Sequence, residues 1–192
     1  KNWRNQRTGN NMQALEAYQK SLASFEATGN KPMLADTLFN LGLINFLLGN
    51  YTPALEYHQK NLKLSEELGN KNQIANTLSR MSLIYRLQGD FAQALEYAGR
   101  SLELSKQLDN RELRANILMT NGLAYSSLGN NTRALEFYQK SLSISEELGN
   151  KLLIANALEK IGGSHFSQGN MAQAIEYYQK SLKLIEELKN KR

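Results

Sequence analysis

Residues 118–138 read LMTNGLAYSSLGNNTRALEFY, and versions of this stretch return along the chain with a period of 40 residues. The period holds without a gap over the 192 residues. A repeat of this length decides the architecture, so it takes precedence over any local assignment of structure. Five residue types recur in one register, which chance does not supply: Gly at 9, 49, 89, 129 and 169; Ala at 14, 54, 94, 134 and 174; Glu at 16, 56, 96, 136 and 176; Leu at 22, 62, 102, 142 and 182; and Asn at 30, 70, 110, 150 and 190.

The sequence of each 40-residue unit predicts two helices. The first runs from about 33 to 48, because Leu34, Leu38 and Leu41 are spaced as on one face of an amphipathic helix. Gly49 is expected to end it, and Asn50 to cap a second helix from about 52 to 68. Copies of the first helix are expected at 73–88, 113–128 and 153–168. Second helices are expected to start near 12, 52, 92, 132 and 172, and to end at the turns 69–70, 109–110 and 149–150. No segment alternates with period two, so we expect no sheet.

The predicted fold class is therefore all-α, an α-solenoid of stacked antiparallel helix pairs. We divide the chain, as a single array over 1–192, into a truncated repeat at 1–30, mainly its second helix, and four complete repeats at 31–70, 71–110, 111–150 and 151–190. Residues 1–8 align with the end of a first helix but lack its apolar stripe. We therefore expect the chain to be a piece of a longer array.

The repeated residues resemble the tetratricopeptide repeat (TPR) family. Leu118-x-x-Asn121-Gly122-x-x-Tyr125, followed by Ala134-x-x-x-Tyr138, resembles the pattern of that family closely, and the resemblance covers about residues 9–190. It implies a right-handed superhelix in which small residues at 42, 82, 122 and 162 let the two helices of a unit approach. The usual unit has 34 residues and ends in Pro. The longer unit here is similar to those of LGN-like adaptors and of bacterial TPR signalling arrays.

Charge and composition exclude several classes of function. The net charge is +5, but six of the basic residues lie in 1–10 and 189–192. The rest of the chain has 17 basic and 18 acidic residues, so its charges almost cancel. This distribution does not form the clustered basic face that nucleic acid requires. There is no Cys, no long apolar run and no visible signal peptide, so we expect no membrane partner and take the cytoplasm as the default compartment.

The resemblance to TPR proteins places the binding surface on the concave face, which the first helices line. It implies that unit positions 36, 39, 43 and 46 face the groove, and a helical wheel puts these positions on one stripe. The candidate peptide-binding residues are Asp36, Phe39, Leu43, Phe46, Asn76, Ser79, Leu83, Arg86, Asn116, Met119, Leu123, Asn156, Glu159 and Phe166.

Asn76, Asn116 and Asn156 recur at one position of this groove, with Asp36 in the first unit. An Asn side chain carries both a donor and an acceptor, so a ladder of them could hold the main chain of an extended peptide. The alternative is that they cap or bridge adjacent helices through backbone carbonyls. Both interpretations stay open at the level of sequence.

The groove does not match two ligand patterns of the family. The carboxylate clamp of chaperone-binding TPR domains requires a Lys and an Asn one turn apart, and pairs such as Ser79/Leu83 do not match it. LGN-like arrays carry Arg at the position of Asp36. His58 and His165 replace Tyr at packing positions and have no paired acid or metal-spaced partner. We expect no cofactor, no metal and no enzyme activity.

The last helix predicts a second interaction surface. Leu182, Ile185 and Leu188 form an apolar stripe on it with no following helix to cover them, and such stripes mark missing repeats or a partner. The leading hypothesis is a non-catalytic scaffold that binds an extended or helical peptide segment of a partner protein. The alternatives are an array that associates with copies of itself end to end, and the sensor portion of a larger regulator.

Overall fold

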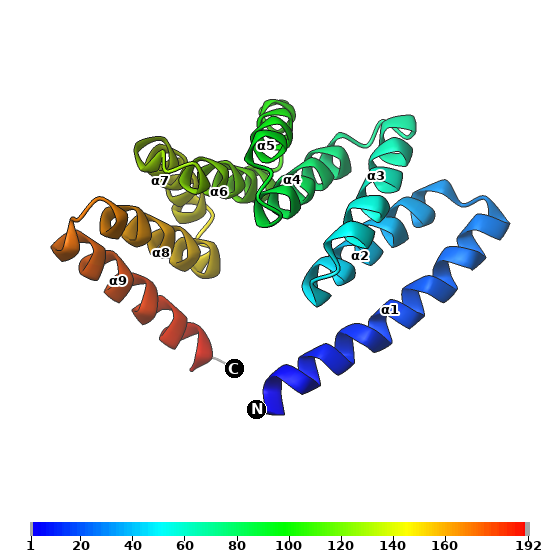
Figure 1. Ribbon diagram of the computed structural model, residues 1–192, viewed down its shortest axis with the longest axis horizontal. Coiled ribbons are helices and arrows are strands. Elements are labelled where there is room, and N and C mark those ends of the chain that lie inside the picture. The colour runs from blue at the N-terminus through cyan, green and yellow to red at the C-terminus, as the bar shows by residue number, and fades with distance from the viewer. Residues whose placement is uncertain (1, 191–192) are drawn as a thin grey trace.

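The computed structural model describes the backbone of residues 2–190 and the side chains of residues 9–190. That part of the chain contains nine α-helices and no strand, which confirms the predicted fold class. Consecutive helices pair and stack in chain order into a curved superhelix (Figure 1). The helices are α1 (Asn2–Thr28), α2 (Lys31–Leu48), α3 (Tyr51–Glu67), α4 (Lys71–Leu87), α5 (Phe91–Ser105), α6 (Arg111–Ser127), α7 (Asn131–Glu147), α8 (Lys151–Ser167) and α9 (Met171–Lys189).

Glycine and asparagine set most of the helix boundaries. Gly49, Gly89, Gly129 and Gly169 have φ angles of 75–83°, which only glycine adopts at low cost. The next residue is the N-cap of the following helix. At six of the helix starts an Asn or Asp side chain accepts a hydrogen bond from the backbone N–H three residues on, namely Asn30, Asn70, Asp90, Asn110, Asn130 and Asn150. Asn50 occupies the predicted cap position but makes no such bond.

Helix α1 differs from the expectation of a second helix starting near residue 12. It runs without a break through Gly9, and the φ angle of Gly9 is not positive as at its copies. Since residues 1–8 carry no apolar stripe, a turn at Gly9 would gain no packing, and a continuous helix keeps its backbone hydrogen bonds. The basic residues Lys1, Lys191 and Arg192, expected to be solvated, lie outside the described residues, and so do the side chains of Arg4 and Arg7.

Helix α5 ends earlier than the sequence predicts. It stops at Ser105, whereas the corresponding helices α3 and α7 continue to Glu67 and Glu147. Asp109 stands where three other units have a glycine with positive φ, namely Gly29, Gly69 and Gly149, and Asp109 does not adopt that conformation. Instead the guanidinium of Arg114 donates to the carbonyls at this end, including that of Leu108 at 2.8 Å. The missing glycine thus explains the short helix.

Within a pair, the two helices meet where a small residue faces a ring. A Cβ added at Gly42 would lie 2.6 Å from Cε1 of His58. A Cβ at Gly122 would collide with the ring of Tyr138, which is almost fully buried. The glycines therefore make room for the rings, in agreement with the expectation that small residues allow close approach.

The second unit has two small residues at the same contact. Ala98 replaces the ring, and Ser82 replaces the glycine. Both are buried, and the Ser82 hydroxyl donates to the carbonyl of Ala94 at 2.7 Å. Two small residues therefore take the place of the glycine and the ring, and this contact stays buried.

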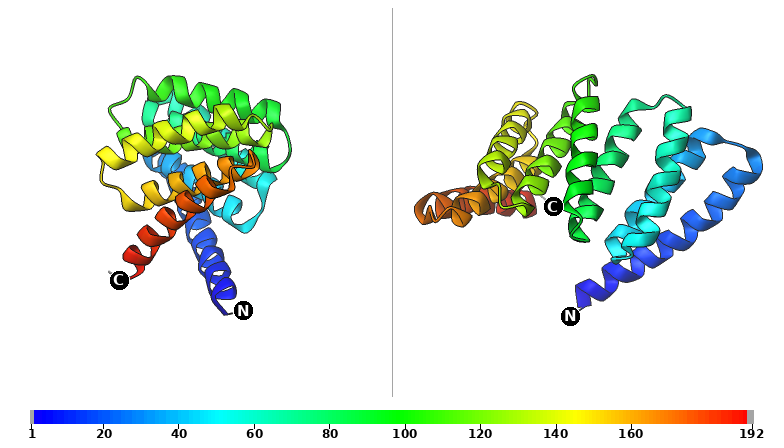
Figure 2. Two further views of the ribbon diagram at one scale, coloured as in Figure 1. Left: turned by 90° about the vertical axis from the view of Figure 1, so that its left-hand side faces the viewer. Right: turned by 45° about the horizontal axis from the view of Figure 1, so that its top comes forward.

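The curvature follows from which helices touch. Helix α2 contacts α4, α4 contacts α6, and α6 contacts α8, whereas no two consecutive odd-numbered helices do so within the described residues. The even-numbered helices therefore line the inner, concave side of the arc in Figure 1. Figure 2 shows the same stack from two further directions.

Recurring polar contacts tie each second helix to the first helix of its unit. Hydroxyl or amide donors at one repeat position bond to a carbonyl 26 residues earlier: Asn61 to Ala35 at 2.7 Å, Ser101 to Ala75 at 2.6 Å, Ser141 to Ala115 at 2.8 Å and Ser181 to Ala155 at 2.8 Å. Ion pairs such as Lys31–Glu67 at 3.0 Å close the end of the helix pair. The buried hydrogen bonds from these side chains to the carbonyls fix the register of the two helices in each pair.

Candidate functional site

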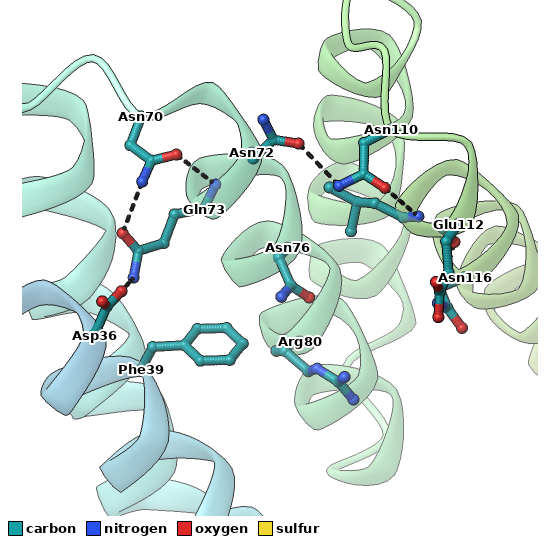
Figure 3. A pocket seen from close by; sticks show the side chains of 11 residues that line it. Asp36, Phe39, Asn70, Asn72, Gln73, Asn76, Arg80, Asn110, Glu112 and Asn116 are labelled. Atoms are coloured by element: carbon teal, nitrogen blue, oxygen red, sulfur yellow. Dashed lines mark hydrogen bonds between the residues drawn. The ribbon is translucent and has the colours of Figure 1, made fainter.

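A cavity of about 500 Å³ opens on the concave side between α2, α4 and α6 (Figure 3). Four of the sequence-predicted groove residues line it together: Asp36, Phe39, Asn76 and Asn116. Side-chain amides make up much of the remaining wall. The other lining residues are Asn70, Asn72, Gln73, Arg80, Asn110, Glu112 and Leu113.

The rim of the cavity is held by hydrogen bonds between the first turns of neighbouring inner helices. Asn70 caps α4 by accepting from the N–H of Gln73 at 3.1 Å. The Gln73 amide donates to Asp36 on α2 at 3.0 Å. The Asn110 amide, at the start of α6, donates to Asn72 on α4 at 3.1 Å. Asp36 therefore bridges two inner helices through its side chain (Figure 3).

Deeper in the cavity several polar groups remain available. The Asn116 amide donates to the carbonyl of Glu112 in its own helix at 3.1 Å, which leaves its oxygen free. Asn76 and Arg80 are half-buried, and neither side chain forms a hydrogen bond or ion pair with any other described residue. The cavity thus offers both donors and acceptors, and Phe39 adds an apolar face.

A buried histidine lies behind this wall. The ring of His58 tilts against that of Phe39, with centroids 5.6 Å apart, and neither of its ring nitrogens has a hydrogen-bond partner. Burial, and then the positive charge of Arg80, lower the pKa of His58 to about 4. Burial also lowers the pKa of the Arg80 guanidinium. His58 is a neutral packing residue at neutral pH.

Three of the predicted groove residues lie in packed surroundings instead. Ser79 is buried, and its hydroxyl donates to Thr120 on α6 at 3.0 Å. Met119 and Leu123 pack against the core cluster of Ala134, Tyr138 and Ile161. Ser79 is therefore not an open groove residue, and the binding role expected for Met119 and Leu123 stays a prediction. The contact of α4 with α6 covers Ser79, whereas residues of α7 and α8 pack against Met119 and Leu123.

The remaining predicted residues are spread along the concave side and do not line this cavity. Leu43, Leu83 and Arg86 are half-buried, and so is Phe46, whose ring lies 6.2 Å from that of Tyr51. Asn156 is exposed, Glu159 pairs with Lys160 at 2.9 Å, and Phe166 is 56% exposed. The structure thus concentrates the candidate site on α2, α4 and α6.

Sequence reasoning missed Arg80, Glu112 and the amides of the rim. The signal was available: Asn72, Asn76 and Arg80 are four residues apart, so they share one polar face of α4. Asn76 belongs to the stripe that the family pattern suggested, and Asn72 and Arg80 lie one turn to either side of it. A search of the sequence for polar residues at this spacing would have identified this wall of the cavity.

Two further hollows lie outside the concave side. A cleft of about 500 Å³ between α5 and α7 has an apolar wall that includes Leu102, Phe137 and Ile144. A smaller one of about 220 Å³ near the end of α9 is lined by Leu152, Ile185, Leu188 and Lys189. No group of three or more acidic or histidine side chains that could hold a metal occurs in the described part of the chain.

The model of a known family matches nearly the whole chain. Its description is tetratricopeptide repeat, and it matches residues 5–67, 39–107, 73–147 and 113–187. The chain belongs to the tetratricopeptide repeat family. No curated protein matches the sequence.

Solved structures show the same TPR fold at low sequence identity. A Rap protein complexed with competence and sporulation factor has a TM-score of 0.87 at 17% identity; the match covers 96% of this chain and 52% of the Rap chain. BtubC from P. vanneervenii has a TM-score of 0.78 at 19% identity, covering 96% of this chain and 76% of that one. MamA has a TM-score of 0.63 at 24% identity, covering 98% and 96%.

These findings place the TPR array in the class of protein-interaction scaffolds. TPR proteins are generally non-catalytic. The chain spans about half the length of the Rap protein that it matches. No helix among residues 2–190 is both long enough and apolar enough to cross a membrane.

Proposed function

We propose that the concave cavity between α2, α4 and α6 binds an extended or helical peptide segment of a partner protein, and that the TPR array has no catalytic activity of its own. The observation that carries this proposal is the set of unengaged polar groups in an open cavity of about 500 Å³. Such a cavity, with a few polar groups on a fixed wall, is the usual setting of a binding site.

The chemistry of the wall fits a peptide backbone. A peptide segment presents a carbonyl acceptor and an N–H donor at each residue. Asn76 can satisfy both, and Asn116 keeps its amide oxygen as an acceptor. The ring of Phe39 offers an apolar contact for one side chain of the segment. The hydrogen-bonded rim keeps these groups in place before binding, which lowers the entropic cost of association.

The Rap structure adds support from shape alone. That protein holds competence and sporulation factor, and its fold superposes on almost all of this chain. A stacked TPR array of this fold therefore occurs in a protein that is complexed with a factor.

The test uses degenerate pools of fluorescent 12-residue peptides and measures binding by polarisation. The variant Asn76→Ala/Asn116→Ala should weaken binding about tenfold or more, because two hydrogen bonds of about 0.5–1.5 kcal/mol are lost. The matched control is Gln139→Ala, which removes an exposed amide from the outer helix α7. No binding by any pool, or an equal loss in both variants, would contradict the proposal.

A second candidate function is end-to-end association of two copies through α9. Leu182 and Ile175 are each 57% exposed on this helix, and Ile185 and Leu188 line the small cleft beside Leu152. Light scattering over a concentration series tests whether two copies associate through α9. If the mass rises with concentration and Leu182→Gln/Ile185→Ser stops the rise, this surface is an interface. A constant mass counts against it.

The third hypothesis, that the array is the sensor portion of a larger regulator, remains compatible with peptide binding. In that case the concave cavity would be the input site. The peptide experiment tests the cavity in the same way under both hypotheses.

A further inference from the structure

The cleft of about 500 Å³ between the outer helices α5 and α7, the outer cleft, combines an apolar surface with a basic border. Leu118 of α6 is buried at its floor, and the half-buried side chains of Leu102, Phe137 and Ile144 form its walls. None of the described residues that line the outer cleft carries a carboxylate. An apolar centre inside a polar rim is the usual anatomy of a protein interface. The polar lining residues are Lys106, Arg114, Lys140 and Ser143.

Two of the three basic residues are departures from the 40-residue repeat. Lys106 stands at a position that is acidic in the four other units, namely Glu26, Glu66, Glu146 and Glu186. Arg114 stands at a position that is apolar elsewhere, namely Leu34, Ile74 and Ile154. Capping of α5 accounts for Arg114. The ammonium of Lys106, in contrast, pairs only with Glu103 among the described residues, so no contact across the fold explains its change of charge.

The basic groups of this border can still bind a negatively charged ligand. The Nε and Nη2 atoms of Arg114 donate to backbone carbonyls, which leaves Nη1 unused. The Lys140 ammonium lies 5.8 Å from the centre of the Phe137 ring and forms no ion pair with a described residue. Lys106 pairs with Glu103 at 2.6 Å, but these side chains are 58% and 70% exposed, so the pair is weak. A carboxylate of a ligand can therefore take the place of Glu103.

From this geometry we propose that the outer cleft receives an amphipathic helix of a partner protein, whose apolar stripe is bordered by Asp and Glu residues. A helix presents apolar residues three and four positions apart on one side, which suits a groove between two helices. The acidic residues beside the stripe then face Lys106, Arg114 and Lys140. This site lies on the outer helices, so it goes beyond the proposed function of the concave cavity and does not depend on it.

The experiment compares three 18-residue helical peptides by fluorescence polarisation. They share one stripe of leucines, and the residues that border the stripe are all Glu, all Gln or all Lys. The Glu peptide should bind about threefold to tenfold more tightly than the Gln peptide, because each partly exposed ion pair contributes modestly. The Lys peptide should bind most weakly. Added salt should reduce the preference for Glu, because it screens exposed charges.

Substitutions then locate the preference. Lys106→Glu introduces the residue of the other units and should remove most of the preference for the Glu peptide. Ile144→Ser removes part of the apolar wall and should weaken all three peptides alike. The matched control is Lys63→Glu, which reverses an exposed charge on α3 at the position where α5 carries Glu103. Thermal unfolding of each variant checks that the fold persists.

The variant Asn76→Ala/Asn116→Ala should leave binding of the Glu peptide unchanged, which separates this site from the concave cavity. The inference is overturned if no peptide binds, if the Glu and Gln peptides bind equally, or if Lys106→Glu keeps the preference. It is also overturned if the mass of the chain alone rises with concentration and Ile144→Ser stops the rise, because the occupant of the outer cleft is then a second copy.

Discussion

The contact between a small residue and a ring, seen at Gly42 and His58 and again at Gly122 and Tyr138, sets the distance between the two helices of a unit. Because the added Cβ would meet a buried ring, these glycines are required by packing rather than by backbone conformation. Their φ angles are not positive. In the second unit the small residues Ser82 and Ala98 stand at this contact instead, and both are buried.

Replacing Gly122 by Ala tests this packing account. The new Cβ collides with the ring of Tyr138, so the free energy of unfolding should fall by about 1–3 kcal/mol. The control is Gly99→Ala in α5, where nothing lies within 4 Å of the added Cβ. There the loss of a helical glycine should raise the free energy of unfolding by about 0.5–1 kcal/mol. Urea unfolding measures both, and equal effects would refute the account.

His58 predicts a pH dependence of stability. Its pKa is about 4 in the folded protein, below its ordinary value of 6.5, so the unfolded chain binds the proton more tightly. The free energy of unfolding should therefore be highest above pH 6.5 and fall as the pH drops toward 4, by up to about 3 kcal/mol from this residue. The order of magnitude is set by the size of the pKa shift.

The variant His58→Tyr isolates that contribution, since Tyr138 shows that the corresponding position in another unit accepts a tyrosine. Urea unfolding at pH 7 and pH 4.5 should show a smaller loss of stability for the variant than for the wild-type chain. The same pH slope in both proteins would mean that the buried imidazole does not control it.

At the scale of whole helices, the junction of α5 and α6 departs most from the repeat. Arg114 occupies a position that is apolar in the other units, as at Ile74 and Ile154. Its guanidinium donates to the carbonyls of Ser105 at 3.2 Å and of Leu108 at 2.8 Å. One arginine therefore replaces the glycine cap that Asp109 cannot provide.

Arg114→Ile should restore the apolar residue but leave the end of α5 without donors. Amide hydrogen exchange at residues 104–109 should speed up by about tenfold or more, because hydrogen bonds to a charged group contribute about 1.5–3 kcal/mol. The control, Arg100→Gln, removes an arginine of α5 that pairs with Glu96 and not with the carbonyls at this end. Unchanged exchange at 104–109 in Arg114→Ile would argue against a capping role.

Element by element, the sequence predicts the helices well where local signals agree. The Gly and Asn turns gave most boundaries within a few residues, since their conformations are decided locally. Two boundaries were missed. The turn at Gly9 depends on a packing partner that the preceding residues do not offer, and the end of α5 depends on Arg114, which is remote from the turn pattern.

The candidate site was predicted less completely than the helices. Asp36 and Asn76 were found because they recur at one repeat position. Arg80 was missed and Ser79 was misplaced because both depend on how closely α4 packs against α6, which the repeat pattern does not encode. A period of 40 residues predicts which positions of the units are equivalent. The cavity, in contrast, depends on residues in which the units differ from one another.

At the scale of the whole molecule, the concave arrangement of the even-numbered helices brings side chains from three of them into one cavity. Each unit of such an array contacts mainly its neighbours, so the cavity depends on the stacking of three inner helices. The central claim is that this concave side, and neither the outer cleft between α5 and α7 nor the stripe of α9, receives the partner segment that Asn76 and Asn116 hold by its main chain.

Hydrogen–deuterium exchange of the chain with and without a 12-residue peptide taken from the best-binding pool tests that claim most directly. We predict slower exchange in the first turns of α4 and α6 and in the middle of α2, with no change at 102–106, 137–144 or 182–188. Protection confined to the outer cleft or to α9, with none on α2, α4 and α6, would contradict the account.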